Sequence, residues 1–183
     1  GPTGLGVLYG KKKWLDKLPP AEGGGEMIEH VSFEKTTYNV LPYKFEAGTP
    51  NYVGSYAFGK AIDYMQEIGL ENIASYENEL AKYLEQQLST LPNIHVYATN
   101  QPKAGAISFN AYREDGTLIH PFDVGVLLDR QGVAVRTGHH CAEPLIDHLQ
   151  VPGTVRASVA MYNTKEDIDT FITALKKAIM MFL

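Results

Sequence analysis

The densest group of reactive side chains is the run Arg-Thr-Gly-His-His-Cys-Ala at residues 136–142, which is followed by Glu143 and Pro144. Cys141 is the single cysteine of the chain, so it has no partner for an internal disulfide. Pro144 suits the first turn of a helix, which places Cys141 on a loop close to a helix start. The positive helix end, Arg136 and protonated imidazoles would each favour the nucleophilic thiolate. Cys141 is therefore a reactive nucleophile, an intermolecular bridge or, like many free cysteines, a buried core residue.

A metal site is a weaker interpretation of the same run. His139, His140 and Cys141 are adjacent, and adjacent side chains on an extended backbone point to opposite faces. Structural zinc ligands are usually two to four residues apart and are joined by a distant second pair. We therefore expect no metal site here.

Two further positions could bind an anion. Arg156 lies in the middle of a predicted strand, where its guanidinium needs a carboxylate or phosphate partner, or an edge from which it reaches water. The polar turn 46–51 leads into a helix, so the Thr49 hydroxyl and nearby amides could hold a phosphate. Thr49 or Asn51 could instead simply cap that helix. The residues alone leave both pairs of alternatives open.

The elements that position these residues alternate between strands and helices. We predict strands over 5–9, 94–98, 106–110, 133–136 and 155–162, extended structure over 28–43, and helices over 53–68, 73–91, 123–130 and 143–149. Thr164 should cap a last helix, and the residues of that helix expected to face the core are Ile168, Phe171, Ile172, Leu175 and Ile179. Gly69 ends the first long helix and is the candidate domain boundary. The predicted fold class is α/β, a sheet covered by helices.

Composition limits the possible functions. The 183 residues are 44% hydrophobic and 20% charged, with a formal net charge of -5, as in an ordinary globular protein. The only dense basic run is 11–13, so we do not expect nucleic acid as a partner. No apolar run approaches the ~20 residues of a membrane span, and no signal segment is recognised. We therefore expect no membrane association and a cytoplasmic location.

Seven segments carry a pattern that points to a known family, and they are residues 1–4, 23–28, 45–51, 119–125, 136–144, 151–158 and 162–164. Together, and in this order, they resemble the SufS-type cysteine desulfurases, pyridoxal-phosphate (PLP) enzymes of the class V aminotransferase family. The resemblance covers nearly the whole chain. It implies a fold-type I architecture, in which residues 1–69 are the end of the large PLP-binding domain. Residues 70–183 would then be the small C-terminal domain that carries the cysteine loop.

The resemblance also implies roles for single residues. Cys141 matches the nucleophile that attacks the sulfur of L-cysteine held on PLP, which leaves alanine and a persulfide for iron–sulfur cluster assembly. Arg156 matches the arginine that binds the substrate carboxylate, while Arg136 and His140 belong to the loop and would support substrate binding. Thr49 matches a residue that reaches the cofactor phosphate of the neighbouring subunit, which implies a homodimer. A SufE- or SufU-like protein would accept the sulfur.

One family feature is not found. In these enzymes the lysine that holds PLP covalently lies just before the Gly-Pro-Thr-Gly segment, and here Gly1 begins the sequence. We expect the chain by itself not to release alanine from cysteine with added PLP, and residues 1–69 to expose apolar surface. Two other functions remain compatible with the sequence: a selenocysteine lyase of the same family, and a non-catalytic module that docks a sulfur-acceptor protein.

Overall fold

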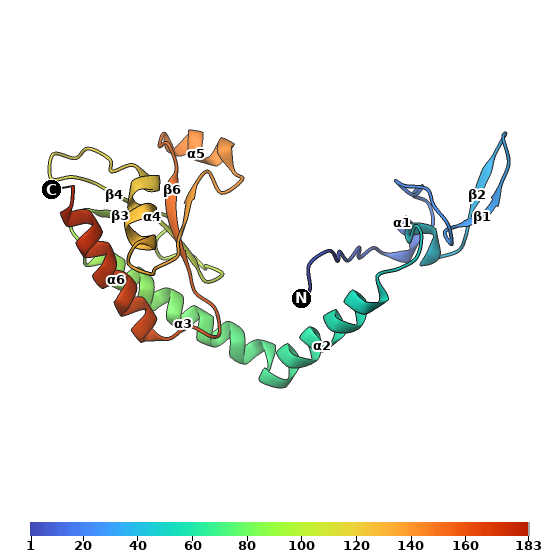
Figure 1. Cartoon of the computed structure of the whole chain (residues 1–183), viewed down its shortest axis with the longest axis horizontal. Helices are drawn as coiled ribbons and strands as arrows, with labels where there is room; N and C mark the ends of the chain where they lie inside the picture. The colour runs from blue at the N-terminus through green and yellow to red at the C-terminus, as the bar shows by residue number, and fades with distance from the viewer. Residues whose placement is uncertain (183) are drawn as a thin grey trace. The chain divides into compact units, whose positions relative to one another are not determined.

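The computed structural model describes residues 1–182, which form two compact units, Gly1–Ile68 and a second that begins at Gly69 (Figure 1). The first unit contains α1 (Lys12–Leu15), β1 (Ile28–Val31), β2 (Thr36–Tyr38), the 3-10 turn η1 (Tyr43–Phe45) and α2 (Tyr52–Ile68). The second contains α3 (Leu70–Ser89), β3 (Ile94–Val96), β4 (Ala106–Ala111), α4 (Pro121–Asp129), β5 (Arg136–Gly138), α5 (Glu143–Leu149), β6 (Thr154–Ser158) and α6 (Lys165–Met180). The assignment of residues 1–69 and 70–183 to two domains of a larger enzyme stays a prediction.

The second unit is built on a four-stranded antiparallel sheet in the order β3-β4-β6-β5. Side chains of a strand alternate between the two faces of a sheet. Ile107 and Phe109 of β4 and Val155 and Ala157 of β6 are buried in one core with residues of α3, α4 and α6. The α/β class with a helix-covered sheet is confirmed, and the opposite face of the sheet carries polar side chains, some of which are buried.

Helix α6 begins and packs as the sequence predicts. The Thr164 hydroxyl accepts a hydrogen bond from the Asp167 amide at 3.2 Å, and the Asp167 carboxylate accepts one from the Thr164 amide at 3.0 Å. This reciprocal pair is a capping box, which satisfies two amides at the helix start. The five residues predicted to face the core are all buried: Ile168, Phe171, Ile172, Leu175 and Ile179.

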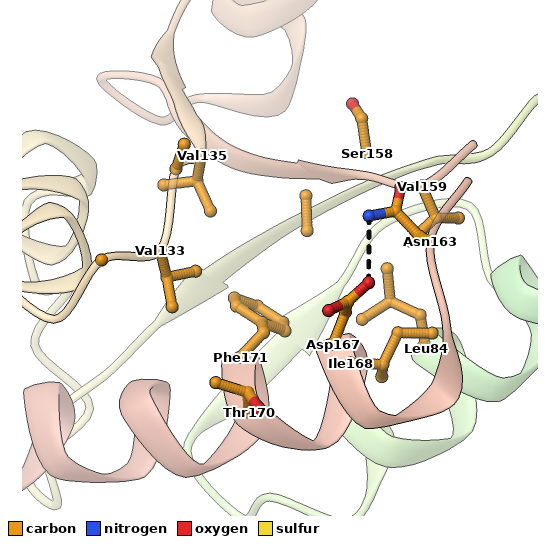
Figure 2. Close-up of a pocket in the computed structure, with 13 residues that line it drawn as sticks. Leu84, Val133, Val135, Ser158, Val159, Asn163, Asp167, Ile168, Thr170 and Phe171 are labelled. Atoms are coloured by element: carbon orange, nitrogen blue, oxygen red, sulfur yellow. Dashed lines mark hydrogen bonds between the residues drawn. The ribbon is translucent and has the colours of Figure 1, made fainter. Parts of the chain in front are cut away.

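Three strand predictions are wrong in position. Residues 5–9 form no strand, because within residues 1–182 no strand pairs with them, and an extended segment needs a hydrogen-bonded neighbour. The predicted strand 133–136 is displaced, since β5 pairs with β6 only over Arg136–Gly138. Val133 and Val135 instead point into a pocket above α6 (Figure 2). The strand expected over 155–162 ends at Ser158.

The first unit has almost no core. Among the buried hydrophobic residues of the described chain, only Met27 belongs to it. Helix α2 exposes Tyr52, Val53 and Tyr56, and Phe33 in the turn between β1 and β2 is fully exposed. The expected apolar surface of residues 1–69 is therefore confirmed. Within the described part of the chain, no helix has the length and apolar character needed to cross a membrane.

Candidate functional site

The face of the sheet opposite the core helices brings two arginines together. In the antiparallel register Arg156 lies opposite Arg136 on β5 and opposite Ser108 on β4, and directly opposed side chains share a face. Neither guanidinium forms an ion pair with any residue between 1 and 182, and the Arg156 Nε is buried without a hydrogen-bond partner. Like charges opposite one another destabilise a sheet unless an anion lies between them. The pair is therefore suited to bind a small anion such as a carboxylate.

Cys141 lies on the loop between β5 and α5, and its side chain is exposed. The Arg136 Nη2 donates a hydrogen bond to its Sγ at 3.2 Å, so a thiolate here would face a positive charge. Pro144 lies in the first turn of α5, as predicted, and the helix starts two residues after the cysteine. Exposure rules out the alternative of a buried core cysteine in this structure.

The His140 side chain lies against the sheet. Its Nε2 is 2.8 Å from the Thr154 Oγ1 and 3.2 Å from the Thr154 carbonyl oxygen. Burial lowers the pKa of His140 from its ordinary value of 6.5, and the positive charge of Arg156 is the second cause in the same direction. His140 is therefore a neutral imidazole at pH 7, and its predicted part in substrate binding stays a prediction.

A cavity of about 290 Å³ adjoins these groups. Ser108, His140, Thr154 and Arg156 are among the residues that line it, and most of the lining surface is apolar. Cys141 lies in the chain between two lining residues, His140 and Ala142. Clefts that hold drug-sized ligands begin at about 300 Å³, so this cavity suits a smaller molecule.

Thr49 belongs to the first unit, whereas Cys141, Arg136, Arg156 and His140 belong to the second. The Asn51 Oδ1 accepts a hydrogen bond from the Gly54 amide at 2.9 Å, so Asn51 caps α2. The Thr49 side chain is exposed and forms no hydrogen bond with another described residue. Its hydroxyl is free for a ligand, and its role at a cofactor phosphate stays a prediction.

Sequence reasoning missed Ser108 and Thr154. Both alternate with buried apolar residues along their strands, Ser108 with Ile107 and Phe109, and Thr154 with Val155. That alternation is the signal that would have placed them on the polar face. Within residues 1–182, His, Cys, Asp and Glu side chains form no group of three that could hold a metal ion.

A second pocket, of about 320 Å³, lies between the start of α6 and the segment that precedes β5 (Figure 2). Val133, Val135, Val159 and Phe171 point into it, and its Asn163 Nδ2 and Asp167 Oδ2 are 3.4 Å apart and bonded to each other. It contains none of the residues predicted to do chemistry. The cavity beside Arg156 is therefore the better candidate site.

Comparison with known proteins gives consistent results. The sequence pattern of the family described as aminotransferase class-V matches residues 1–171. A probable cysteine desulfurase of Halalkalibacterium halodurans is 50% identical over 177 residues, which is 97% of this chain and 42% of that protein. A cysteine desulfurase of Escherichia coli is 47% identical over 178 residues, again 97% of this chain and 42% of that protein.

Two solved structures extend the likeness to three dimensions. The cysteine desulfurase CsdA of Escherichia coli is 36% identical, with a TM-score of 0.88 over 99% of this chain and 44% of its own. The apo cysteine desulfurase of Thermococcus onnurineus is 37% identical, with a TM-score of 0.89 over 98% of this chain and 44% of its own. The chain thus spans less than half the length of the proteins it matches.

Proposed function

Because the chain belongs to the aminotransferase class-V family, we propose that it forms the part of a PLP-dependent cysteine desulfurase that carries the sulfur nucleophile. The whole protein would convert L-cysteine to L-alanine and leave a persulfide on Cys141. The observation that carries this proposal is the placement of an exposed thiol 3.2 Å from the Arg136 guanidinium, on a loop beside the unpaired Arg156.

Arg156 would receive the carboxylate of the substrate. A guanidinium binds a carboxylate with two parallel hydrogen bonds, which would supply the partner that its buried Nε lacks. Ser108, opposite Arg156 in the sheet, lines the same cavity. Together these groups would orient the substrate with its sulfur toward the Cys141 loop.

Cys141 would then attack the substrate sulfur as a thiolate stabilised by Arg136. A sulfur–sulfur bond forms as the carbon–sulfur bond of the substrate breaks. The electron pair of the broken bond stays with the substrate carbon and takes up a proton, which yields alanine. The sulfur remains on Cys141 as the persulfide, so atoms and charge balance.

PLP would contact this chain through Thr49. The exposed hydroxyl has no hydrogen-bond partner within residues 1–182, and Thr49 follows Gly48, whose φ of 79° bends the turn. A free hydroxyl in such a turn fits a phosphate oxygen. When bound, PLP supplies the electron withdrawal that weakens bonds at the carbon atoms of the substrate.

The assembly of the whole protein is part of the same proposal. The exposed apolar side chains of α2, among them Tyr52, Val53 and Tyr56, support a homodimer in which this surface is covered. The exposure of Cys141 supports transfer of sulfur to an acceptor protein of the SufE or SufU kind. We place the protein in the cytoplasm, where a single unpaired cysteine stays reduced.

The test uses the complete polypeptide that contains this chain, supplied with PLP and L-cysteine, and measures alanine formation and the mass of the Cys141 peptide. We expect the wild type to carry one additional sulfur on that peptide, and Cys141→Ser to form no persulfide. Arg156→Lys should raise KM for cysteine about tenfold or more, because an ammonium lacks the fork that grips a carboxylate. Arg113→Lys, an exposed arginine in a turn, is the matched control. Undiminished alanine formation by Cys141→Ser would refute the proposal.

A further inference from the structure

The backbone of the cysteine loop is held in an unfavourable conformation. His140 and Cys141 have φ angles of 57° and 60°, in the left-handed region that residues with a Cβ seldom occupy. Two such residues in succession persist only where surrounding contacts hold them. The loop therefore needs an anchor, and an exposed cysteine cannot be that anchor.

The side chain of His140 supplies the contact. Its Nε2 lies 3.2 Å from the Thr154 carbonyl oxygen, and the Thr154 hydroxyl can pair with Nε2 in either neutral tautomer, since a hydroxyl both donates and accepts. The same Nε2 is 2.8 Å from the Thr154 hydroxyl, the shorter of the two contacts. The other ring nitrogen, Nδ1, is buried without a partner. Every hydrogen bond that fixes this ring within the described chain thus goes to Thr154.

Thr154 is itself firmly placed. It begins β6, is 2% exposed and pairs with Gly138 of β5. The carbonyl of the preceding residue, Gly153, accepts a hydrogen bond at 3.0 Å from the Nδ2 of Asn110, which is completely buried. A Cβ on Gly153 would come within 3.0 Å of the Gly138 Cα, so the two strands are in close contact here. The anchor point is part of the sheet and not of the loop.

The charges around His140 favour this arrangement. Arg156, Arg136 and His139 all lie close enough to oppose a positive charge on its ring. A neutral ring keeps its contacts with Thr154 and avoids that repulsion. The ring therefore links the cysteine loop to the sheet through its contacts with Thr154.

We propose that Thr154 is a positioning residue for the nucleophile: by holding His140, its hydroxyl keeps the Cys141 Sγ against the Arg136 guanidinium. This rests on the proposed function only in taking Cys141 as the nucleophile. The anchored loop holds the Cys141 Sγ against the Arg136 guanidinium, and a released loop would lose that contact.

The experiment measures alkylation of Cys141 by iodoacetamide in the present chain, where no second cysteine interferes. Thr154→Val keeps the shape of the side chain and removes only the hydroxyl. We expect alkylation at about pH 7 to slow about fivefold, the factor that corresponds to one ordinary hydrogen bond. At about pH 10, where free thiols are ionised, the rates should converge, because the loss concerns the thiolate fraction and not access. Thr154→Ser restores the hydroxyl and should restore the rate.

Two controls separate positioning from general loosening. Thr173→Val removes an exposed hydroxyl that is bonded to a helix carbonyl at 2.9 Å, and it should leave alkylation unchanged. If Thr154 acts through His140, then Thr154→Val should have no further effect in a His140→Ala background, because interacting residues are not additive. Three outcomes would overturn the proposal. They are a fivefold lower alkylation rate in the His140→Ala background too, equal slowing at both pH values, and an unchanged rate in Thr154→Val.

Alkylation needs neither PLP nor turnover of cysteine. A failed desulfurase assay in the complete protein therefore leaves this measurement intact. Conversely, suppose that Thr154→Val leaves the alkylation rate unchanged while the complete wild-type protein forms the persulfide normally. That result would refute the positioning role of Thr154 and leave the proposed function standing.

Discussion

His140 is a residue whose protonation the fold opposes. Its imidazole is partly buried, and Arg156, Arg136 and His139 surround it with positive charge. The hydrogen bond to the Thr154 carbonyl acts in the other direction but is outweighed, so the pKa of His140 lies below its ordinary value of 6.5. The stability of the loop therefore depends on pH through this ring.

The sign of that dependence follows from linkage. Above about pH 6.5 the ring is neutral in both folded and unfolded chains, so His140 makes no pH-dependent contribution. As the pH falls below that value, the unfolded chain binds a proton at His140 before the folded chain does, because the folded-state pKa is lower. The free energy of unfolding therefore decreases. We predict that the wild type loses more stability between about pH 7.5 and pH 5.5 than His140→Gln, in urea unfolding followed by circular dichroism. Parallel losses in the two proteins would contradict this.

Residue types alone single out Cys141, Arg136 and Arg156 as candidates, because a lone thiol beside cations and a charge inside a strand are unusual in any sequence. For Ser108 and Thr154, alternation along their strands indicates the face that they share, but the residues that lie opposite them appear only when the strands are paired. Their register with Arg156 and Gly138 is a non-local property that spacing along the chain does not give.

Helix α6 is the element whose start depends most on a single side chain. Thr164→Ala removes the hydroxyl that accepts from the Asp167 amide, and N-cap losses of this kind cost about 1 kcal/mol. We predict that Thr164→Ala lowers the free energy of unfolding by this amount, as measured by urea denaturation. Thr173→Ala lies within the same helix on its exposed face and should cost nothing or stabilise slightly, since alanine favours helix interiors. Equal destabilisation by both changes would show that the cap contributes nothing.

The contrast between helices and strands explains which elements the sequence predicts well. Helix α5 begins at Glu143 and α6 follows Thr164 as expected, because caps, prolines and helical periodicity are local signals. The strands predicted over 5–9 and 133–136 are wrong because an apolar run becomes a strand only beside a partner.

At the scale of the whole chain, the two units differ sharply in buried apolar surface. The core cluster of the second unit draws on α3, α4, α6 and the sheet, whereas the first unit buries Met27 alone among its large hydrophobic residues. Burial of apolar area is the main stabilising contribution to folding. The second unit therefore holds nearly all of the stability of this chain.

We predict that hydrogen exchange separates the units. Amides in β4, β6 and α6 should be protected to the level of global unfolding, while those before Val53 should exchange quickly. Leu84→Ala, which opens a space at a completely buried position of α3, should lower protection throughout the second unit by about 2–5 kcal/mol. Strong protection before Val53 would contradict this division.

The two arginines that oppose each other across β5 and β6 also make the fold responsive to the salt around it. An anion that settles between them relieves their repulsion, and any species that binds only the folded chain raises Tm. Sulfate should therefore raise Tm more than chloride at equal ionic strength, and Arg136→Gln should remove most of the difference. If so, sulfate and phosphate buffers would both stabilise the protein and compete with the carboxylate of its substrate.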